Sequence, residues 1–159
     1  MKQVFDNWKV NAENEFDENF KFLVEHRGED IDEVTHEIHK EVFEEVDCLA
    51  CGNCCRTTPA ILLKSDIKRI AKHLNLPPKT FIKKYTITDI NGEISLSSVP
   101  CMFLNEDNTC QVYEIRPRAC REYPHTDQDS FSSRPKLNAK NTIVCPASFE
   151  IVNRLKQIL

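Results

Sequence analysis

Eight cysteines carry most of the chemistry that this chain of 159 residues can perform. Half of them stand in one short run and the others stand singly, in the order Cys48, Cys51, Cys54, Cys55, then Cys101, Cys110, Cys120 and Cys145. Two-residue spacings let one loop aim successive thiolates at a metal, and Gly52 eases the tight turn within the run. The sequence therefore predicts a thiolate metal site built from all eight cysteines.

The spacing also bears on which metal is bound. Structural zinc sites commonly combine two separate Cys-x-x-Cys pairs, or one such pair with two histidines. This chain has instead three closely spaced cysteines and a remote Cys145-Pro146, which is typical of bacterial ferredoxin sites that hold a 4Fe–4S cluster. An iron–sulfur cluster is favoured on this ground, and zinc stays open.

The cysteines are expected to form two centres. Neighbouring residues on an extended or turning backbone direct their side chains apart, so Cys54 and Cys55 are assigned to different centres. One centre would contain Cys48, Cys51, Cys54 and Cys145, and the other Cys55, Cys101, Cys110 and Cys120. His125 is expected at the surface, since eight cysteines suffice for two four-coordinate sites.

Arginines stand close to the cysteines in the sequence. A centre with several thiolates keeps a net negative charge, which is costly to bury without compensation. The arginines expected to pair with sulfur or with acidic neighbours are Arg56, Arg116, Arg118 and Arg121.

The longer cysteine pattern resembles the YkgJ-type cysteine-cluster proteins, a CxxCxxCC family that is described as a proposed zinc- or iron-chelating domain. The resemblance covers residues 48–146 and implies metal binding by the cysteines. It rests on the run from Cys48 to Cys55, on Pro100-Cys101-x-Phe103-Leu104, and on Cys110-x-x-Tyr113-Glu114-x-Arg116-Pro117-x-x-Cys120-Arg121-x-Tyr123-Pro124. Flagellin lysine N-methylases look similar over this region, but they are larger. With three glycines, this chain also shows no glycine-rich loop to hold S-adenosylmethionine.

Length, charge and hydropathy bear on the number of domains, the partners and the compartment. The length suits one domain with a real core. A net charge of −4 leaves no general attraction for nucleic acid or an anionic membrane. No apolar run approaches a signal peptide or a membrane-spanning helix, so a cytoplasmic protein is expected, in a compartment where thiols serve metals rather than disulfides. The resemblance to the YkgJ-type proteins implies a bacterial one.

Helical periodicity predicts most of the elements around the cysteines. Apolar residues at three- and four-residue steps predict one long N-terminal helix, namely Phe5, Trp8, Ala12, Phe16, Phe20 and Leu23. Asp30 and Glu33 resemble a capping box that opens a second helix, and the two helices would pack as a hairpin over residues 1–46.

Further along, Ser65 or Asp66 can cap a helix to Leu74, and Pro77-Pro78 starts another to Tyr85. Asn91-Gly92 predicts a β-hairpin with strands at 86–90 and 93–97, and a second ribbon is expected around residues 105–108. The polar residues 125–141 are expected to form an exposed loop, followed by a helix that Pro146 begins.

Together these elements predict a fold that is mainly α with a small antiparallel β-hairpin, an irregular α+β arrangement. A single domain, 1–159, is expected: the helical hairpin 1–46 packed on the cysteine-rich metal-binding core 48–146, with a C-terminal helix at 146–159.

Three functions are compatible with these patterns. The leading hypothesis is a noncatalytic module with a redox, metal-handling or structural role, because no substrate motif accompanies the ligands and no catalytic residue is predicted. The first alternative is a metal-dependent enzyme, such as a relative of the flagellin lysine N-methylases. The second is a protein that binds a partner protein through its N-terminal helices.

Overall fold

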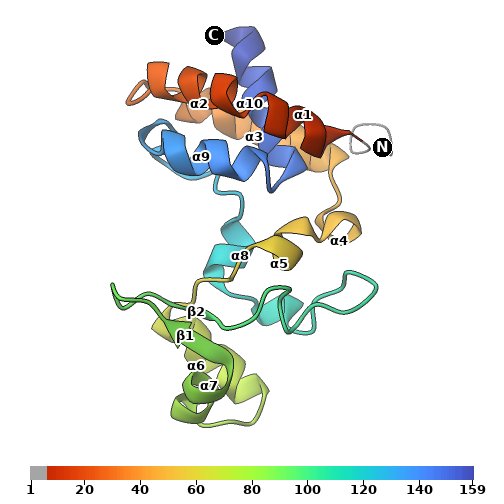
Figure 1. Cartoon of the computed structure of the whole chain (residues 1–159), viewed down its shortest axis with the longest axis vertical. Helices are drawn as coiled ribbons and strands as arrows, with labels where there is room; N and C mark the ends of the chain where they lie inside the picture. Colours follow the sequence, from red (N-terminus) through yellow and green to blue (C-terminus); the bar gives the residue numbers. More distant parts are fainter. Residues whose placement is uncertain (1–6) are drawn as a thin grey trace. The chain divides into compact units, whose positions relative to one another are not determined.

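The computed structural model describes residues 7–159, which form two compact units. Unit 1 contains residues 7–48 and 124–159, and unit 2 contains Leu49–Tyr123 (Figure 1). Among residues 7–159, no helix is both long enough and apolar enough to cross a membrane.

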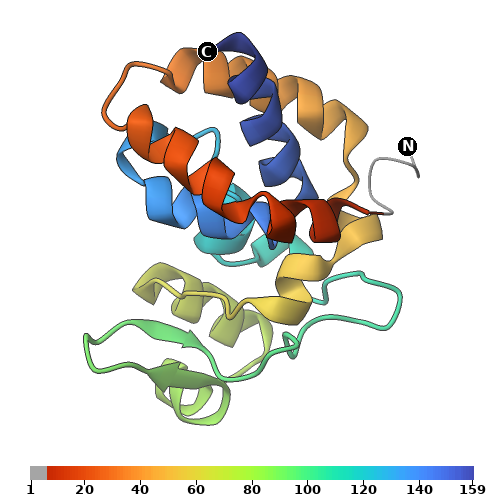
Figure 2. The ribbon, with the colours of Figure 1, turned by 45° about the horizontal axis from the view of Figure 1, so that its top comes forward.

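Unit 1 is a helical bundle in which the C-terminal helices are central. Helix α2 packs on α9, and α10 packs on α1, α3 and α9. Figure 2 shows the dark-blue α10 between the red α1–α2 segment and the pale-orange α3. The elements of this unit are α1 (Trp8–Asn14), α2 (Phe16–Glu25), α3 (Asp32–Glu45), η2 (Phe131–Ser133), α9 (Pro135–Thr142) and α10 (Pro146–Ile158).

The N-terminal prediction is right about helices and wrong about their boundaries. The backbone of Glu15 leaves the helical region (φ −93°, ψ 5°), so the predicted long helix is divided into α1 and α2. Phe5 lies outside the described residues. The predicted capping box is absent, since Ile31 is the N-cap of α3 and no side chain caps it. The two N-terminal helices are expected from the sequence to pack on each other as a hairpin. Instead, α2 packs mainly on α9 and α3 packs mainly on α10.

The expectation of an exposed loop at 125–141 is wrong. Pro135 occupies the first turn of α9, where its missing N–H costs nothing. The buried face of this segment is largely polar, and its side-chain amides donate to backbone carbonyls: Asn138 donates to the oxygen of Phe131 at 2.7 Å, and Asn141 donates to that of Pro124 at 2.9 Å. Phe131 is fully buried. Polar composition therefore hid a helix that belongs to the core of unit 1.

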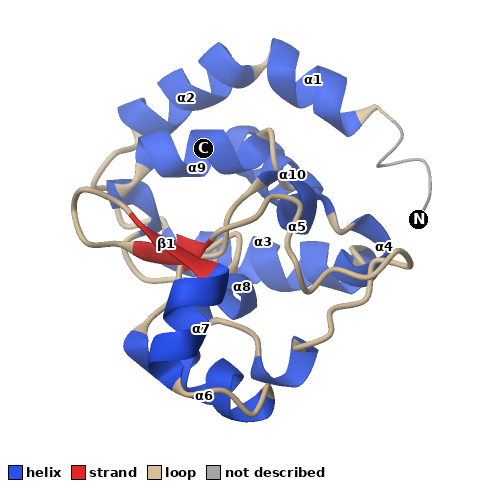
Figure 3. Cartoon of the chain, turned by 60° about the horizontal axis from the view of Figure 1, so that its bottom comes forward, coloured by secondary structure: helices blue, strands red, loops and turns tan. Residues whose placement is uncertain are grey.

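Unit 2 surrounds a smaller apolar core with short helices and one two-stranded sheet. Its core residues are Leu62, Ile67, Ile70, Ala71, Phe81, Leu96, Phe103 and Val112. Figure 3 colours the two strands red. The elements that follow α4 (Cys48–Cys51) are α5 (Asn53–Thr57), α6 (Lys64–His73), α7 (Pro78–Tyr85), β1 (Thr86–Thr88), β2 (Ile94–Leu96), η1 (Tyr113–Ile115) and α8 (Arg118–Glu122).

The predicted β-hairpin is confirmed, with shorter strands. β1 and β2 pair antiparallel, with Thr86 opposite Leu96. Asp89 closes the turn, because its Oδ1 accepts the N–H groups of Asn91 (2.9 Å) and Glu93 (2.8 Å), and Gly92 takes φ +83°. The fold class is thus mainly α with a small antiparallel hairpin, as predicted. The single-domain organisation stays a prediction.

A matched pair of substitutions tests the place of residues 125–141 in the core. Phe131→Ala should lower the free energy of unfolding of unit 1 by about 3–5 kcal/mol, because it empties a fully buried site. Phe20→Ala, at a side chain that is 37% exposed, should cost only about 1 kcal/mol. Urea denaturation followed by circular dichroism measures both free energies. Equal losses would mean that residues 125–141 do not belong to the core of unit 1.

Candidate metal centre

The cysteine run folds as two short helices joined by a glycine. α4 carries Cys48 and Cys51, and α5 carries Cys54 and Cys55. Gly52 connects them with φ +58°, a left-handed conformation that other residues rarely adopt. Each helical turn therefore presents two cysteines, and the glycine sets the angle between the turns.

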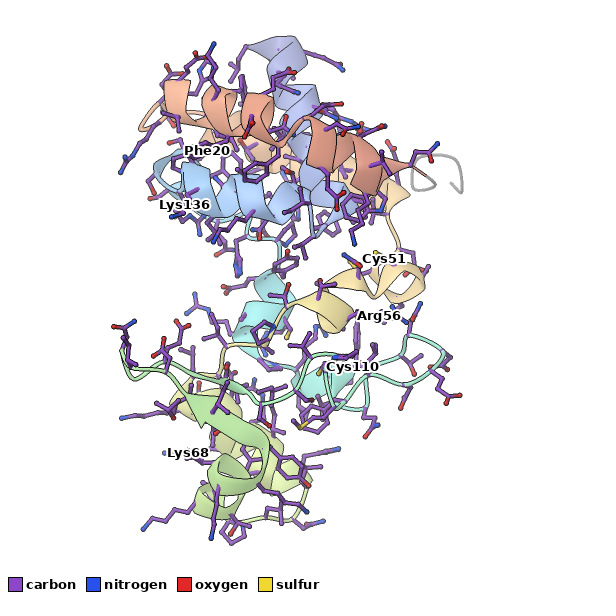
Figure 4. The ribbon with its side chains drawn as sticks, viewed as in Figure 1. Phe20, Cys51, Arg56, Lys68, Cys110 and Lys136 are labelled. Carbon is purple, nitrogen blue, oxygen red and sulfur yellow. The ribbon has the colours of Figure 1, made fainter. Side chains whose placement is uncertain are left out.

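Arg56 and Asn108 clamp this run to the loop at residues 105–109. The Arg56 guanidinium donates to the carbonyl oxygen of Cys51 at 3.3 Å and also to the side-chain oxygen of Asn108. Asn108 in turn donates to the carbonyl oxygen of Ala50 at 3.1 Å. A β-carbon at Gly52 would lie 2.7 Å from Nη1 of Arg56, so the guanidinium would have to move away from the partners that it clamps. Figure 4 labels Cys51 in this run, Arg56 directly after it, and Cys110 directly after the loop.

Two turns of matching geometry carry Cys101 and Cys110. Each cysteine carbonyl accepts the N–H three residues ahead, from Leu104 at 3.1 Å and from Tyr113 at 3.2 Å. Each cysteine sulfur accepts the N–H two residues ahead, from Phe103 and from Val112. We refer to these as the cysteine turns.

Backbone contacts hold the cysteine turns together and join them to α5. The predicted second ribbon is present as a bridge between Leu104 and Cys110. Gln111 donates its N–H to the oxygen of Phe103 at 2.9 Å, and Cys101 donates its N–H to the oxygen of Cys55 at 2.7 Å. The side chains of Phe103 and Val112 are buried in the core of unit 2, so the apolar core fixes the amides that point at sulfur.

Cys120 lies on α8, which a buried ion pair positions. The carboxylate of Asp66 is 1% exposed and lies 2.6 Å from Nη2 of Arg69. It also accepts the N–H of Arg118 at 3.2 Å, at the beginning of α8. Arg69 donates to the carbonyl oxygens of Ile115 and Arg116, both at 3.0 Å. Sequence reasoning treated Asp66 only as a helix cap and did not single out Arg69; their i, i+3 spacing on one helix was the available signal.

The thiols of unit 2 influence one another electrostatically. Although the residue Cys120 is exposed as a whole, desolvation of its sulfur raises the pKa of the thiol, and the thiolates of three neighbours add to the rise: Cys55, Cys101 and Cys110. Burial also raises the pKa of Cys101 and of Cys110, with a further contribution from Cys55. Ionising one of these four sulfurs thus opposes ionising the next, and a cation among them would remove that opposition.

Cys54 and Cys55 do not point apart. The Cys54 side chain hydrogen-bonds the sulfur of Cys55, and this bond is the first cause that lowers the Cys55 pKa to about 7, with the charge of Arg56 contributing. The sequence argument assumed an extended or turning backbone, whereas both residues lie on α5. The reason given for dividing the two centres between them is therefore wrong.

The four arginines differ in their roles. Arg56 lowers the pKa of Cys55, and Arg116 lowers those of Cys110 and Cys120, so these two compensate thiolate charge as expected. Arg118 pairs with Glu122 at 2.6 Å, and Arg121 donates to the carbonyl oxygen of Arg116 at 2.9 Å.

The other predicted residues belong to unit 1. Cys145 is buried at the N-cap of α10, and Cys48 is exposed at the beginning of α4. His125 is half-buried with φ +65°, and its carbonyl oxygen accepts a bond from Arg134 at 3.3 Å. Among residues 7–159, which include all eight cysteines, none forms a disulfide. No group of three or more histidine, cysteine, aspartate or glutamate side chains in that range is arranged to hold a metal ion.

Comparison with known proteins gives one match. The model of the CxxCxxCC family, described as a proposed zinc- or iron-chelating domain, matches residues 47–144. The comparisons with curated proteins and with solved structures find no match.

Two glycine substitutions test the clamp around the cysteine run. Gly52→Ala and Gly92→Ala both place a β-carbon in left-handed backbone, at a cost of about 1–2 kcal/mol. At Gly52 the new atom also meets Arg56, whereas nothing lies within 4 Å at Gly92. Gly52→Ala should therefore lower the free energy of unfolding of unit 2 further, as measured by chemical denaturation. A cost no greater than that of Gly92→Ala would argue against the clamp.

Proposed function

Since this chain belongs to the CxxCxxCC family of proposed zinc- or iron-chelating domains, matched over residues 47–144, we propose that it is a noncatalytic metal-binding module. Its principal centre would be an iron–sulfur cluster or zinc held in unit 2 by Cys55, Cys101, Cys110 and Cys120. The remaining cysteines would serve a second centre: Cys48, Cys51, Cys54 and Cys145. The role of the module would be redox, metal-handling or structural.

The pair of cysteine turns is the observation that carries this proposal. Buried Phe103 and Val112 fix two amides that donate to the sulfurs of Cys101 and Cys110. Amide hydrogen bonds to sulfur stabilise the thiolate, which is the form that binds metal. A pair of ordinary buried thiols would not need donors aimed at both sulfurs. The turns therefore favour ligation over simple packing.

The donor set fits both candidate metals. Four thiolates are a common ligand set for structural zinc and for iron–sulfur clusters. Such a centre keeps a net negative charge. Arg56 offsets it near Cys55, and Arg116 offsets it near Cys110 and Cys120. When bound, zinc would supply folding stability, and an iron–sulfur cluster would supply one-electron transfer as well.

Binding would include a rearrangement of the thiol side chains. The backbone around Cys55, Cys101 and Cys110 is already joined by hydrogen bonds, whereas the side chains of unit 2 are not arranged as a ligand set. Rotation about χ1 moves a sulfur between staggered positions without moving the backbone. Metal binding would therefore need rotation of the cysteine side chains and little movement of the backbone.

The hydrogen bond between Cys54 and Cys55 changes how the second centre should be tested. Two sulfurs in contact can belong to adjacent centres or to the same one. α4 favours a separate group, because Cys48 and Cys51 are one helical turn apart on it. Metal counts on Cys54→Ser and Cys55→Ser separate the two arrangements.

Metal analysis of two variants tests the ligand assignment. Cys110→Ser should lose the metal of one centre, because it removes a thiolate from the cysteine turns, whereas His125→Ala should keep full metal content. Elemental analysis of anaerobically purified protein, with its absorption spectrum, measures both. Broad visible absorbance with iron and acid-labile sulfide identifies a cluster, and a colourless protein with zinc identifies zinc. Equal metal loss in both variants would make the histidine a ligand and refute the all-cysteine set.

Metal removal tests whether the centre stabilises the fold. Binding energy at a site that the unfolded chain lacks is folding energy, so chelation should raise amide hydrogen exchange across residues 49–123. Helices α1–α3 should keep more of their protection, because α9 and α10 hold them. Unchanged exchange at Phe103 and Val112 after complete metal loss would show that the metal is not structural.

A further inference from the structure

A second site in unit 1 has no connection with the cysteines. A surface pocket with a volume of about 430 Å³ lies at the beginning of α9. Four basic residues line it, together with the apolar surface of Pro135 and Leu137: Arg27, Arg134, Lys136 and Lys140. Among the described residues that line this pocket there is no carboxylate. We refer to it as the α9 pocket.

The charges of the α9 pocket are not balanced by ion pairs. Within residues 7–159, none of the four basic side chains lies within ion-pair distance of a carboxylate. Other basic residues of unit 1 are paired: Arg154 lies 2.8 Å from Glu150, and Lys156 lies 3.2 Å from Glu18. The chain has 25 acidic and 21 basic residues, so a carboxylate-free cationic pocket runs against its composition. Like charges gathered in this way attract an anion.

The α9 pocket places cations at the N-terminus of α9. The N-terminus of a helix carries partial positive charge, so cations there are unfavourable and anions favourable. Arg134 is the N-cap of α9 and Lys136 lies in its first turn, and no side chain caps this end. Arg27 has a separate reason for its place, because it follows the C-terminus of α2. Arg134 donates to the carbonyl oxygen of His125 at 3.3 Å, which accounts for its place, so Lys136 is the cation at the unfavourable end of α9 that no ion pair among the described residues explains.

Hydrogen-bond donors also collect at this point. The Nε atom of Arg134 is buried without a hydrogen-bond partner, and a buried donor left unpaired is costly. The first backbone N–H groups of a helix have no partner within the helix. Because this Nε atom has almost no accessible surface, an anion in the α9 pocket would accept from the backbone N–H groups, and from Nε of Arg134 only after the side chain rotates.

We propose that the α9 pocket binds a small phosphorylated ligand. Phosphate oxygens accept bonds from backbone N–H groups at helix N-termini and from arginine in a forked geometry. Lys136 and Lys140 supply further positive charge from α9 itself. The volume lies within the range of ordinary small-molecule pockets, which is enough for a phosphate with an attached apolar group against Pro135 and Leu137.

The test uses the full-length, metal-loaded chain and inorganic pyrophosphate as probe, at constant ionic strength. Backbone amide signals of Arg134, Lys136, Leu137 and Asn138 should shift and saturate; Pro135 between them has no N–H. Lys136→Gln should weaken binding by about tenfold, as expected for losing one charge-assisted contact. Lys68→Gln is the matched control, because it removes the same charge from an exposed position on α6 in unit 2 and should leave the affinity unchanged. Figure 4 labels both lysines.

A stability measurement separates binding from a purely local effect of the charge. Without pyrophosphate, Lys136→Gln should slightly raise the thermal midpoint, because it removes a cation from the beginning of α9. With pyrophosphate, the variant should gain less stabilisation than the unmodified chain. No saturable shift at residues 134–138, shifts confined to the cysteine turns, or equal loss of affinity in Lys68→Gln would each overturn the proposal.

Discussion

The carboxylate of Asp66 is the point on which the architecture of unit 2 depends. It is almost fully buried, and it accepts the N–H of Leu63 at the beginning of α6 and the N–H of Arg118 at the beginning of α8. Its partner Arg69 extends this connection to the carbonyl oxygens of Ile115 and Arg116. A buried charge is tolerable only when its partners are in place, so this pair ties two distant segments into one geometry. The position of Cys120 follows from it.

Around that ion pair, the apolar core and the thiols share one segment of chain. Phe103 and Val112 lie in the core, and the same residues supply the amides that face sulfur. Unit 2 spans only Leu49–Tyr123, a size at which a hydrophobic core alone gives limited stability and a bound metal commonly adds to it. Packing and ligation would therefore reinforce each other through the same backbone.

The sequence predicted most where a single local rule decides the structure. Pro78 and Pro146 begin helices, and Asn91-Gly92 marks the hairpin turn, because each restricts its own backbone. It failed where distant partners decide. α9 was missed because Asn138 and Asn141 on its buried face donate to carbonyl groups outside the helix, which no periodicity reveals.

The same limit applies to the candidate site. The spacing of the cysteine run identified its residues, but the relation between Cys54 and Cys55 depends on whether the backbone is helical there. The i, i+3 spacing of Asp66 and Arg69 could have indicated their ion pair, but the carbonyl groups to which Arg69 donates lie more than forty positions away, and no local pattern identifies them.

The division of the chain has a consequence for the order of events during synthesis. Unit 2 is contiguous, so all of its residues have left the ribosome once Tyr123 has emerged. Unit 1 is discontinuous, and α1–α3 must wait for α9 and α10, which are made last. Because domains generally fold as their segments become available, the inserted unit can mature while the helices that precede it still lack their partners.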